Sequence, residues 1–432
     1  DPLLERNGEP VRGKGYITDD LTDHALAFIE QNRNRPFFCY VPYNTPHSPF
    51  QVPDRFYDGF RDKPLVMLGS EPEREEPGKT RCALAMCENI DENVGRILRK
   101  LEELALADRT IVLYFSDNGP NSWRWNGGMK GRKGSLDEGG VRVPLLIRWP
   151  GHIKPGTRIP QIAGAIDLLP TLTDMAGVAR VGNKPLDGMS LRPLLLGKKT
   201  AWPDRMIFSH QNGMVSVRTQ RYRLDAAGRL FDMEKDSGQN RDVSRENPEL
   251  QDRLARAVSR WKEEVLPNPP DDDRPFPVGD SSFPVTTLPA RDAVPHGLIR
   301  RSASAPNCSF FTDWRSVDDR ITWDVEVATA GSYEAVINYT CAKQDVGSTI
   351  ELGFEGSTIR ATVTEDHDPP LVGAEFDRVP REGESYVKDF KPLRLRVLRL
   401  EKGRGALTLR ALSVAGVRVM DVRSVTLTLK EH

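Results

Sequence analysis

The sequence has little cysteine, no long apolar run and no excess of charge of one sign. Its 432 residues include five cysteines, too few and too scattered for a disulfide scaffold, and no CxxC pair, which disfavours a zinc site. No apolar run approaches the roughly 18 residues of a membrane span. With 61 Lys and Arg against 62 Asp and Glu, no net field favours nucleic acid or an anionic membrane as a partner. The sequence leaves open whether Cys308 and Cys341 form a disulfide.

The N-terminus also lacks features that a complete precursor would carry. The first ten residues, DPLLERNGEP, contain no initiating Met and neither the basic nor the apolar region of a signal peptide. The chain also begins in the middle of a secondary-structure pattern. We therefore expect that a further segment precedes Asp1.

Up to residue 204 the sequence alternates between helical and strand patterns. Apolar side chains recur on one face of two segments, 18–32 and 81–106, which predicts helices. Runs rich in β-branched and aromatic residues predict strands at 36–43, 110–116 and 143–149. This alternation predicts an α/β domain over residues 1–204, with a mostly parallel sheet covered by helices on both faces and incomplete at its N-terminus.

After residue 204 the pattern changes. Residues 205–266 contain short strands followed by a helix near 247–265, which predicts a small antiparallel sheet with one helix packed on it. Residues 267–295 are rich in proline and predict a semi-rigid linker. Seven or eight alternating strands within residues 296–432 predict a β-sandwich or jelly roll.

The predicted sandwich contains aromatic residues that suggest two different roles. They could offer stacking faces to a carbohydrate, or they could fill the sandwich core, which we favour for any one of them. These residues are Trp314, Trp323, Tyr333 and Tyr339.

Three polar clusters follow or border strands of the first domain. The stretch IVLYFSDNGP is an apolar strand pattern that stops on Asp117 and Asn118. These two residues could form a local turn or helix cap, or could bind a ligand at the strand tip. His47 lies in the loop NTPHSP, and Lys133 lies in a glycine-rich, basic loop whose backbone could approach an oxyanion.

Together these clusters suit one chemical task. Hard oxygens from Asp117 and Asn118 favour calcium or magnesium over zinc. A metal, the Lys133 ammonium and the His47 imidazole converging on one point would neutralise and protonate a tetrahedral oxyanion, as in a sulfate or phosphate ester.

The same segments resemble the sulfatases of the alkaline phosphatase superfamily over about residues 1–265. The resemblance rests on PFFCYVPYNTPHSPFQVP, IVLYFSDNGP, KGSLDEGGVRVPLLIRWPG, DLLPTLTDMAGV and LDGMSLRPLL. It implies an alkaline phosphatase-like fold and a sulfuric ester hydrolase, with calcium and a formylglycine nucleophile. It also implies a sulfated carbohydrate as substrate, by analogy with sulfatases that carry appended sandwiches, and a periplasmic or secreted location.

The resemblance also implies roles for individual residues. Asp117 and Asn118 would coordinate the calcium, Lys133 would contact the sulfate, and His47 would lie beside the leaving group. Glu138 and Arg142, in EGGVRVP, would fix the loop.

The sequence departs from the sulfatase pattern in what it omits. It has no C/S-x-P-x-R motif for the formylglycine, no Asp-Asp pair to complete the metal site and no GKWH-like segment. We therefore expect an N-terminally truncated sulfatase that holds calcium weakly and does not turn over ester as given.

Two other functions remain open at this stage. A phosphomonoesterase or phosphonate hydrolase of the same superfamily would need further Asp and His metal ligands, and the histidines do not form that arrangement near Asp117. A non-catalytic carbohydrate-binding protein or pseudoenzyme would act through the sandwich.

Overall fold

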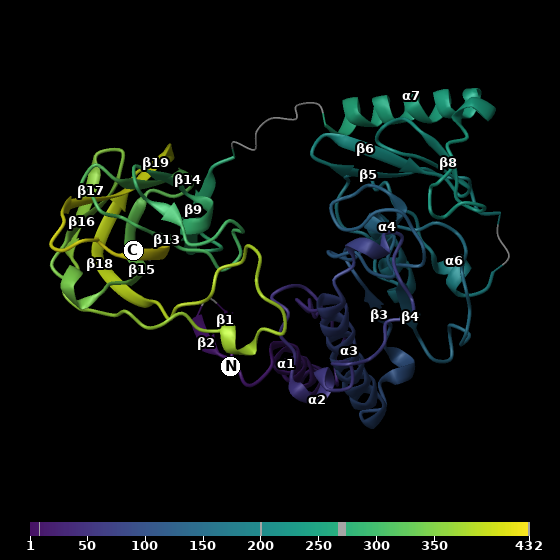
Figure 1. Ribbon diagram of the computed structural model, residues 1–432, viewed down its shortest axis with the longest axis horizontal. Helices are drawn as coiled ribbons and strands as arrows, with labels where there is room; N and C mark the ends of the chain where they lie inside the picture. The colour runs from purple at the N-terminus through teal and green to yellow at the C-terminus, as the bar shows by residue number, and fades with distance from the viewer. Residues whose placement is uncertain (8, 199–200, 267–273, 431–432) are drawn as a thin grey trace. The chain divides into compact units, whose positions relative to one another are not determined.

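The computed structural model describes residues 1–7, 9–198, 201–266 and 274–430, and it divides into two compact units (Figure 1). Unit 1 comprises Asp1–Leu3 and Arg12–Pro269, and unit 2 comprises Leu4–Val11 and Pro270–His432. The units are described separately below.

Unit 1 is built around a two-stranded sheet between helices. β3 (Val112–Phe115) and β4 (Leu145–Arg148) pair through Val112↔Arg148 and Phe115↔Leu145. One face packs Val112 against Ile29 of α1 (Ile17–Gln31) and Leu101 of α3 (Pro77–Glu103). The other face packs Ile111 and Ile147 against a cluster from α5 (Leu168–Ala176) and α6 (Arg192–Leu195). The predicted α/β class, with helices on both faces, is confirmed.

The pairing of the strands differs from the prediction of a mostly parallel sheet. β3 and β4 run antiparallel, and among the described residues the segment 36–43 forms no strand. A strand exists only where its backbone groups find a ladder partner, so β-propensity alone does not produce one. The segment instead leaves Phe38 and Tyr40 78% and 71% exposed.

The C-terminal part of unit 1 is a four-stranded antiparallel sheet with one helix, as predicted. α7 (Pro248–Val265) presents Leu250, Leu254 and Val258 to a cluster that includes Val217 and Leu230. The strands follow chain order: β5 (Ile207–Gln211), β6 (Met214–Arg218), β7 (Tyr222–Leu224) and β8 (Leu230–Asp232). The remaining short helices are α2 (Asp54–Tyr57), α4 (Glu138–Val141), η1 (Pro72–Arg74), η2 (Ala107–Arg109), η3 (Ala165–Asp167) and η4 (Ser244–Glu246).

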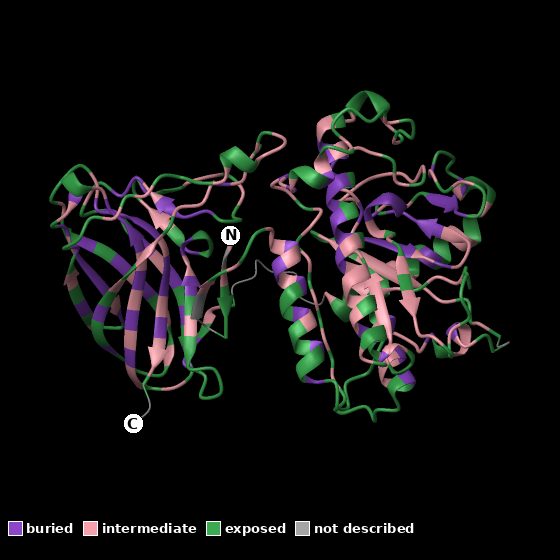
Figure 2. Cartoon of the chain, turned by 90° about the horizontal axis from the view of Figure 1, so that it is seen from below, coloured by how far each residue is buried: buried purple, intermediate pink, exposed green. Residues whose placement is uncertain are grey.

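Unit 2 is a β-sandwich of two six-stranded sheets, which agrees with the predicted β-rich region. The first sheet has the order β12-β13-β20-β15-β18, with β10 also on β20, and the second has the order β11-β14-β19-β16-β17, with β9 also on β14. Buried side chains alternate along the strands and fill one continuous core (Figure 2).

The strands of the first sheet are β10 (Val285–Pro289), β12 (Arg300–Arg301), β13 (Phe311–Thr312), β15 (Gly331–Thr340), β18 (Lys391–Leu400) and β20 (Asp421–Leu429). Those of the second are β9 (Phe276–Val278), β11 (Val294–His296), β14 (Arg320–Val327), β16 (Thr349–Phe354), β17 (Ser357–Thr362) and β19 (Gly403–Ser413). β1 (Leu3–Arg6) and β2 (Glu9–Arg12) form a separate pair, and the short helices are η5 (Ala290–Asp292), η6 (Lys343–Asp345) and η7 (Ala374–Phe376).

Part of the predicted linker 267–295 belongs to the sandwich. β9 pairs with β14 and β10 pairs with β20, so ordered pairing begins at Phe276 rather than at 296. Isolated prolines do not prevent this, because β9 and β10 each add to the border of a sheet, where a missing N–H donor is tolerated. Residues 267–273 of the predicted linker lie outside the described residues.

The aromatic residues considered for carbohydrate stacking are core residues. They are at most 1% exposed, so none offers a ring face to a ligand, which removes the basis for a carbohydrate-binding site built on them: Trp314, Trp323, Tyr333 and Tyr339. Inward positions of a two-sided sandwich favour large apolar side chains. Cys308 and Cys341 are both free thiols, the first exposed and the second buried.

Candidate functional site

Asp117 and Asn118 lie immediately beyond the end of β3. Asp117 is exposed and Asn118 is half-buried. The Asn118 amide donates to Asp117 Oδ1 at 3.0 Å, and the Ser116 hydroxyl donates to the Asn118 carbonyl at 3.2 Å. This local bonding fixes the two side chains beside each other at the strand tip.

The glycine-rich loop is joined to this strand tip through its backbone. Gly119 N donates to Gly140 O at 2.9 Å, and Lys133 N donates to Pro120 O at 2.9 Å. A Cβ atom on Gly119 would overlap the carbonyl oxygen of Gly139, so the close approach of the two segments requires glycine. The structure therefore brings the Asp117-Asn118 segment and the Lys133 segment together.

The same loop is anchored to the four-stranded sheet by a buried ion network around Glu138. Arg223 donates to Glu138 Oε2 at 2.7 and 3.1 Å, and Arg218 Nε lies 3.4 Å from the same oxygen. Arg142, which was predicted with Glu138 to fix the loop, is a weaker partner of Glu138 at 3.3 Å. Burial alone would raise the pKa of Glu138, but the surrounding guanidinium groups outweigh it and hold that pKa below its usual range.

Further bonds complete this anchor. Ser216 Oγ and Arg223 Nη1 donate to Leu136 O at 3.0 and 2.8 Å, and the Gln239 carboxamide accepts from Glu138 N at 2.8 Å. Sequence analysis missed Arg218, Arg223 and Gln239, since each lies 80 or more positions from its loop partner. The one available signal was an arginine between apolar residues in a strand pattern, Tyr222-Arg223-Leu224.

His47 lies on a different loop, which is held against α1. Thr45 and Tyr43 of that loop contact Thr18 and Thr22 at 3.1 and 2.7 Å. The exposed His47 ring bonds within its own loop, with Nδ1 2.7 Å from Ser48 O, and makes no bond to Asp117 or Lys133 among the described residues. The structure thus brings together two of the three predicted clusters.

The oxygens of Asp117 and Asn118 fit a hard cation. Asp117 Oδ2 and Asn118 Oδ1 have no hydrogen-bond partner among the described residues, and carboxylate and carboxamide oxygens are typical calcium ligands. In the described part of the chain no three His, Cys, Asp or Glu side chains cluster as a metal site. Calcium takes roughly six to eight oxygens, so this pair could supply only part of a coordination sphere.

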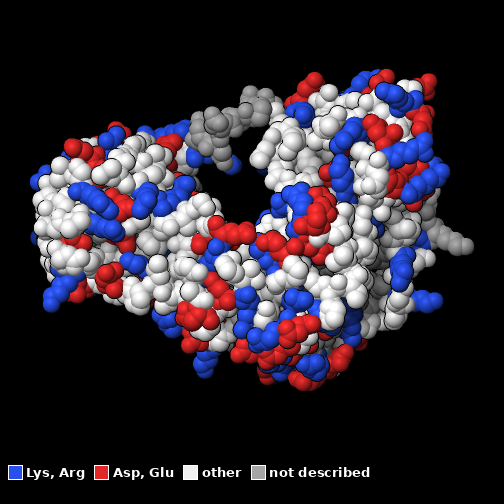
Figure 3. Space-filling model, viewed as in Figure 1, with Lys and Arg blue, Asp and Glu red and all other residues white. Residues whose placement is uncertain are grey.

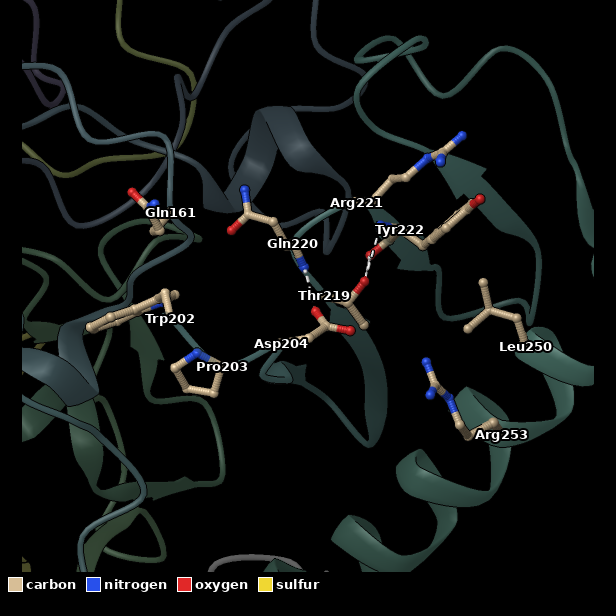
Figure 4. A pocket seen from close by; sticks show the side chains of 10 residues that line it. All are labelled: Gln161, Trp202, Pro203, Asp204, Thr219, Gln220, Arg221, Tyr222, Leu250 and Arg253. Atoms are coloured by element: carbon tan, nitrogen blue, oxygen red, sulfur yellow. Dashed lines mark hydrogen bonds between the residues drawn. The ribbon is translucent and has the colours of Figure 1, made fainter. Parts of the chain in front are cut away.

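A pocket of about 460 Å³ lies elsewhere in unit 1, between Trp202, the β6–β7 turn and α7 (Figure 4). Its polar lining includes Asp204, Gln220 and Arg253, and none of the residues predicted from sequence lines it. The Gln220 side chain is committed to the backbone of Pro160 and Ile162. This pocket is distinct in its lining from the Asp117 strand tip.

Comparison with known proteins identifies unit 1. Residues 3–178 match the sulfatase family model, and residues 132–263 match the model described as N-sulphoglucosamine sulphohydrolase, C-terminal. Residues 3–263 of this chain belong to the sulfatase family. The two matches overlap over residues 132–178, a stretch that includes Lys133 and Glu138, through which the loop is bonded to the four-stranded sheet.

Over the aligned region, individual sulfatases are about one third identical to this chain. Human arylsulfatase A is 34% identical over 211 residues, which is 46% of this chain and 38% of that protein. The uncharacterized sulfatase YdeN of Escherichia coli (strain K12) is 33% identical over 211 residues, which is 47% of this chain and 35% of that protein. The chain therefore spans well under half the length of these relatives.

Comparison with solved structures also finds a similar fold. The crystal structure of Ps i-CgsB in complex with k-i-k-neocarrahexaose matches with a TM-score of 0.53 and 30% identity, over 60% of this chain and 58% of that chain. Within the described residues, no helix is long and apolar enough to cross a membrane.

Proposed function

We propose that this chain forms part of a sulfuric ester hydrolase that acts on sulfated carbohydrate. The observation that supports this most is the backbone junction at Gly119–Gly140 and Pro120–Lys133, because it links two chemically distinct groups in a sulfatase-family unit. The junction combines oxygen ligands at Asp117 and Asn118 with a cation at Lys133. That combination suits the binding of a sulfate group.

Each residue has a proposed task. Lys133 places a point charge against the sulfate oxygens, and the anchored loop holds its backbone in place, so little reorganisation accompanies charge development. Asp117 and Asn118 hold a calcium ion. His47 donates a proton to the leaving oxygen of the bound substrate.

The nucleophile and the other ligands of the calcium ion would be supplied by residues outside this chain. Calcium supplies charge neutralisation at the sulfate, and a formylglycine supplies the nucleophile. No C/S-x-P-x-R motif occurs in residues 1–432, so we expect the chain by itself not to release sulfate.

Two findings support a carbohydrate substrate. The relative Ps i-CgsB was crystallised with an oligosaccharide, k-i-k-neocarrahexaose, and the C-terminal region of unit 1 matches a family model named for a sulfoglucosamine hydrolase. The sugar and the position of its sulfate follow from neither.

The experiment is sulfate release from sulfated glycans and 4-nitrophenyl sulfate. It compares the 432-residue chain with a version extended by the coding sequence that lies upstream of Asp1 in genomic DNA. We expect turnover only from the extended protein, and loss of at least about a hundredfold with Lys133→Ala, which removes the charge on the sulfate. Lys154→Ala, in an exposed loop of the same unit, is the matched control and should leave turnover unchanged.

Three outcomes would contradict the proposal. These are an upstream sequence without a nucleophile motif, equal turnover in both lysine variants, or faster cleavage of 4-nitrophenyl phosphate than of the sulfate. Calcium binding is measured separately by calorimetry on the 432-residue chain, where Asp117→Asn should weaken any binding by about tenfold through loss of one negative ligand.

A further inference from the structure

The outer face of the sheet that contains β14, β19, β16 and β17 carries a row of arginines that crosses these neighbouring strands. Arg320 of β14 lies opposite Arg410 of β19, Arg410 lies opposite Glu351 of β16, and Glu351 lies opposite Arg360 of β17. The residues next to them along each strand, such as Ile321, Leu409 and Ile359, are buried in the core. Because side chains alternate along a strand, the row faces away from the core. We call Arg320, Arg410 and Arg360 the arginine row.

Glu351 holds two of these arginines in fixed orientations. Its Oε1 accepts from Arg410 at 2.6 and 2.9 Å, and its Oε2 accepts from Arg360 Nε at 2.9 Å. The Glu351 side chain is only 4% exposed, whereas those of Arg410 and Arg360 are 53% and 66% exposed. The carboxylate therefore lies beneath the guanidinium groups and leaves their outer N–H donors facing solvent.

Arg320 adds a charge that nothing balances. Among the described residues its side chain has no ion-pair or hydrogen-bond partner, although it lies directly opposite Arg410. His296, on the other side of Arg320, is bonded to Thr322. Like charges opposite each other on a sheet destabilise the fold, so the row of three cations and one anion has a structural cost.

The rest of the same face carries no excess of positive charge. Six residues along β19, Arg404 faces Glu326 in register and forms an ion pair with Asp324 at 2.7 Å. Between the arginine row and the Arg404–Asp324 pair lie the uncharged residues Thr322, Thr408 and Gly353, which we call the threonine strip. The excess positive charge is therefore confined to the arginine row and is not a general property of the sheet.

We propose that the arginine row binds the sulfate groups of a sulfated polysaccharide. The planar guanidinium matches a tetrahedral oxyanion through two parallel N–H donors, and the threonine strip offers hydroxyls to neighbouring sugar hydroxyls. The aromatic residues of these strands, including Trp323 and Phe354, face the core, so this face has no platform on which bases of a single-stranded nucleic acid could stack. The choice of sulfate among oxyanions rests on the function proposed for unit 1.

The test is binding of the 432-residue chain to dextran sulfate, with uncharged dextran as the reference, at two salt concentrations. Arg320→Gln should weaken binding to dextran sulfate about fivefold. It should also reduce the salt dependence of binding, because one exposed ion pair between the protein and a sulfate group is lost. Arg404→Gln removes the same charge from the same face of the sheet, on β19 and outside the arginine row, and should change the affinity less than about twofold. Thermal unfolding of Arg320→Gln should match or slightly exceed the parent, since Arg320 holds no other side chain and its repulsion with Arg410 is lost. Arg404→Gln should lower the unfolding temperature only slightly, since its ion pair with Asp324 is exposed.

Arg360→Gln is a second variant of the row and should weaken binding to a similar extent. Three outcomes would each overturn the proposal. These are equal losses of affinity in Arg320→Gln and Arg404→Gln, binding to uncharged dextran, and tighter binding to duplex DNA than to dextran sulfate. Failure of the sulfatase proposal would look different. In the extended protein, row variants should keep turnover of 4-nitrophenyl sulfate, whereas Lys133→Ala should lose turnover and keep dextran sulfate binding.

Discussion

The two units use apolar residues in different ways. In the sandwich, burial alternates strictly along strands such as β14, and the buried residues join into one continuous cluster (Figure 2). In unit 1, no residue of β3 or β4 is fully buried, and the buried residues that pack against these strands form two small clusters. Unit 1 also exposes Phe38, Tyr40 and Leu146 by more than half. Burial in a common apolar core therefore stabilises the strands of unit 2 to a greater extent than β3 and β4 of unit 1.

Their buried glutamates differ in the same way. Glu138 of unit 1 pairs with Arg223, whose side chain is 3% exposed, whereas the arginines on Glu351 of unit 2 are more than half exposed. A buried pair becomes costly when one partner is removed, but an exposed guanidinium is readily replaced by water. On the face drawn in Figure 3, positive and negative side chains are interspersed over the surface, in line with the net charge of −1.

The largest effect is expected from Trp323→Ala in the sandwich core. Trp323 is 1% exposed and donates to Pro289 O at 3.0 Å, so its removal leaves a large cavity and an unpaired carbonyl. We expect a loss of about 3–5 kcal/mol in the free energy of unfolding. Leu145→Ala in the half-buried β4 of unit 1 should cost about 1 kcal/mol. Hydrogen exchange of peptides from each unit measures both losses, and equal losses would contradict the comparison.

The next largest effect is expected from Arg223→Met. This change leaves Glu138 buried beside a weaker set of partners and should destabilise unit 1 by about 3–5 kcal/mol. Arg360→Met in unit 2 should cost about 1 kcal/mol or less, because Arg410 still holds Glu351. Denaturant unfolding with unit-specific hydrogen exchange distinguishes the two. A larger loss of stability from Arg360→Met than from Arg223→Met would show that the exposure of an arginine does not predict the cost of removing it from its glutamate.

A smaller effect concerns acid. The pKa of Glu138 is lowered, so its contribution to stability is present above the unfolded value of about 4.3 and is lost as pH falls through the folded value. Protection of the loop around Glu138 should therefore fall as pH drops below about 4. Glu138→Gln should be less stable than the parent at neutral pH and show a flatter acid dependence. If the loss of protection at low pH is the same in Glu138→Gln as in the parent, other carboxylates cause it.

The smallest effect is expected at the exposed apolar positions of unit 1. Phe38→Ser removes a side chain that is 78% exposed and should change the free energy of unfolding by less than about 0.5 kcal/mol. Because exposed apolar surface promotes association, the variant should also be more soluble at high concentration. Light scattering and thermal unfolding measure the two quantities. A loss above 1 kcal/mol would mean that Phe38 is packed in solution.

The sequence by itself determined the α/β class of the first part, the sandwich of the last part and the helices near α1, α3 and α7. These follow from local periodicity and propensity, which a short window contains. It also indicated Asp117, Asn118 and Lys133 as candidates, because polar residues at a strand end and glycines in a basic loop are local signals. Their proposed roles stay predictions.

Only the tertiary structure decided the long-range partners. It supplied Arg223 and Arg218 for Glu138, brought the Lys133 loop against the strand tip and placed the sandwich aromatics in the core. It also aligned Arg320, Arg410 and Arg360, which lie 40 or more positions apart, through strand register. The register of a strand and the partners of a side chain depend on residues that are distant in the sequence, because backbone pairing and core packing involve several segments at once. No short stretch of sequence contains that information.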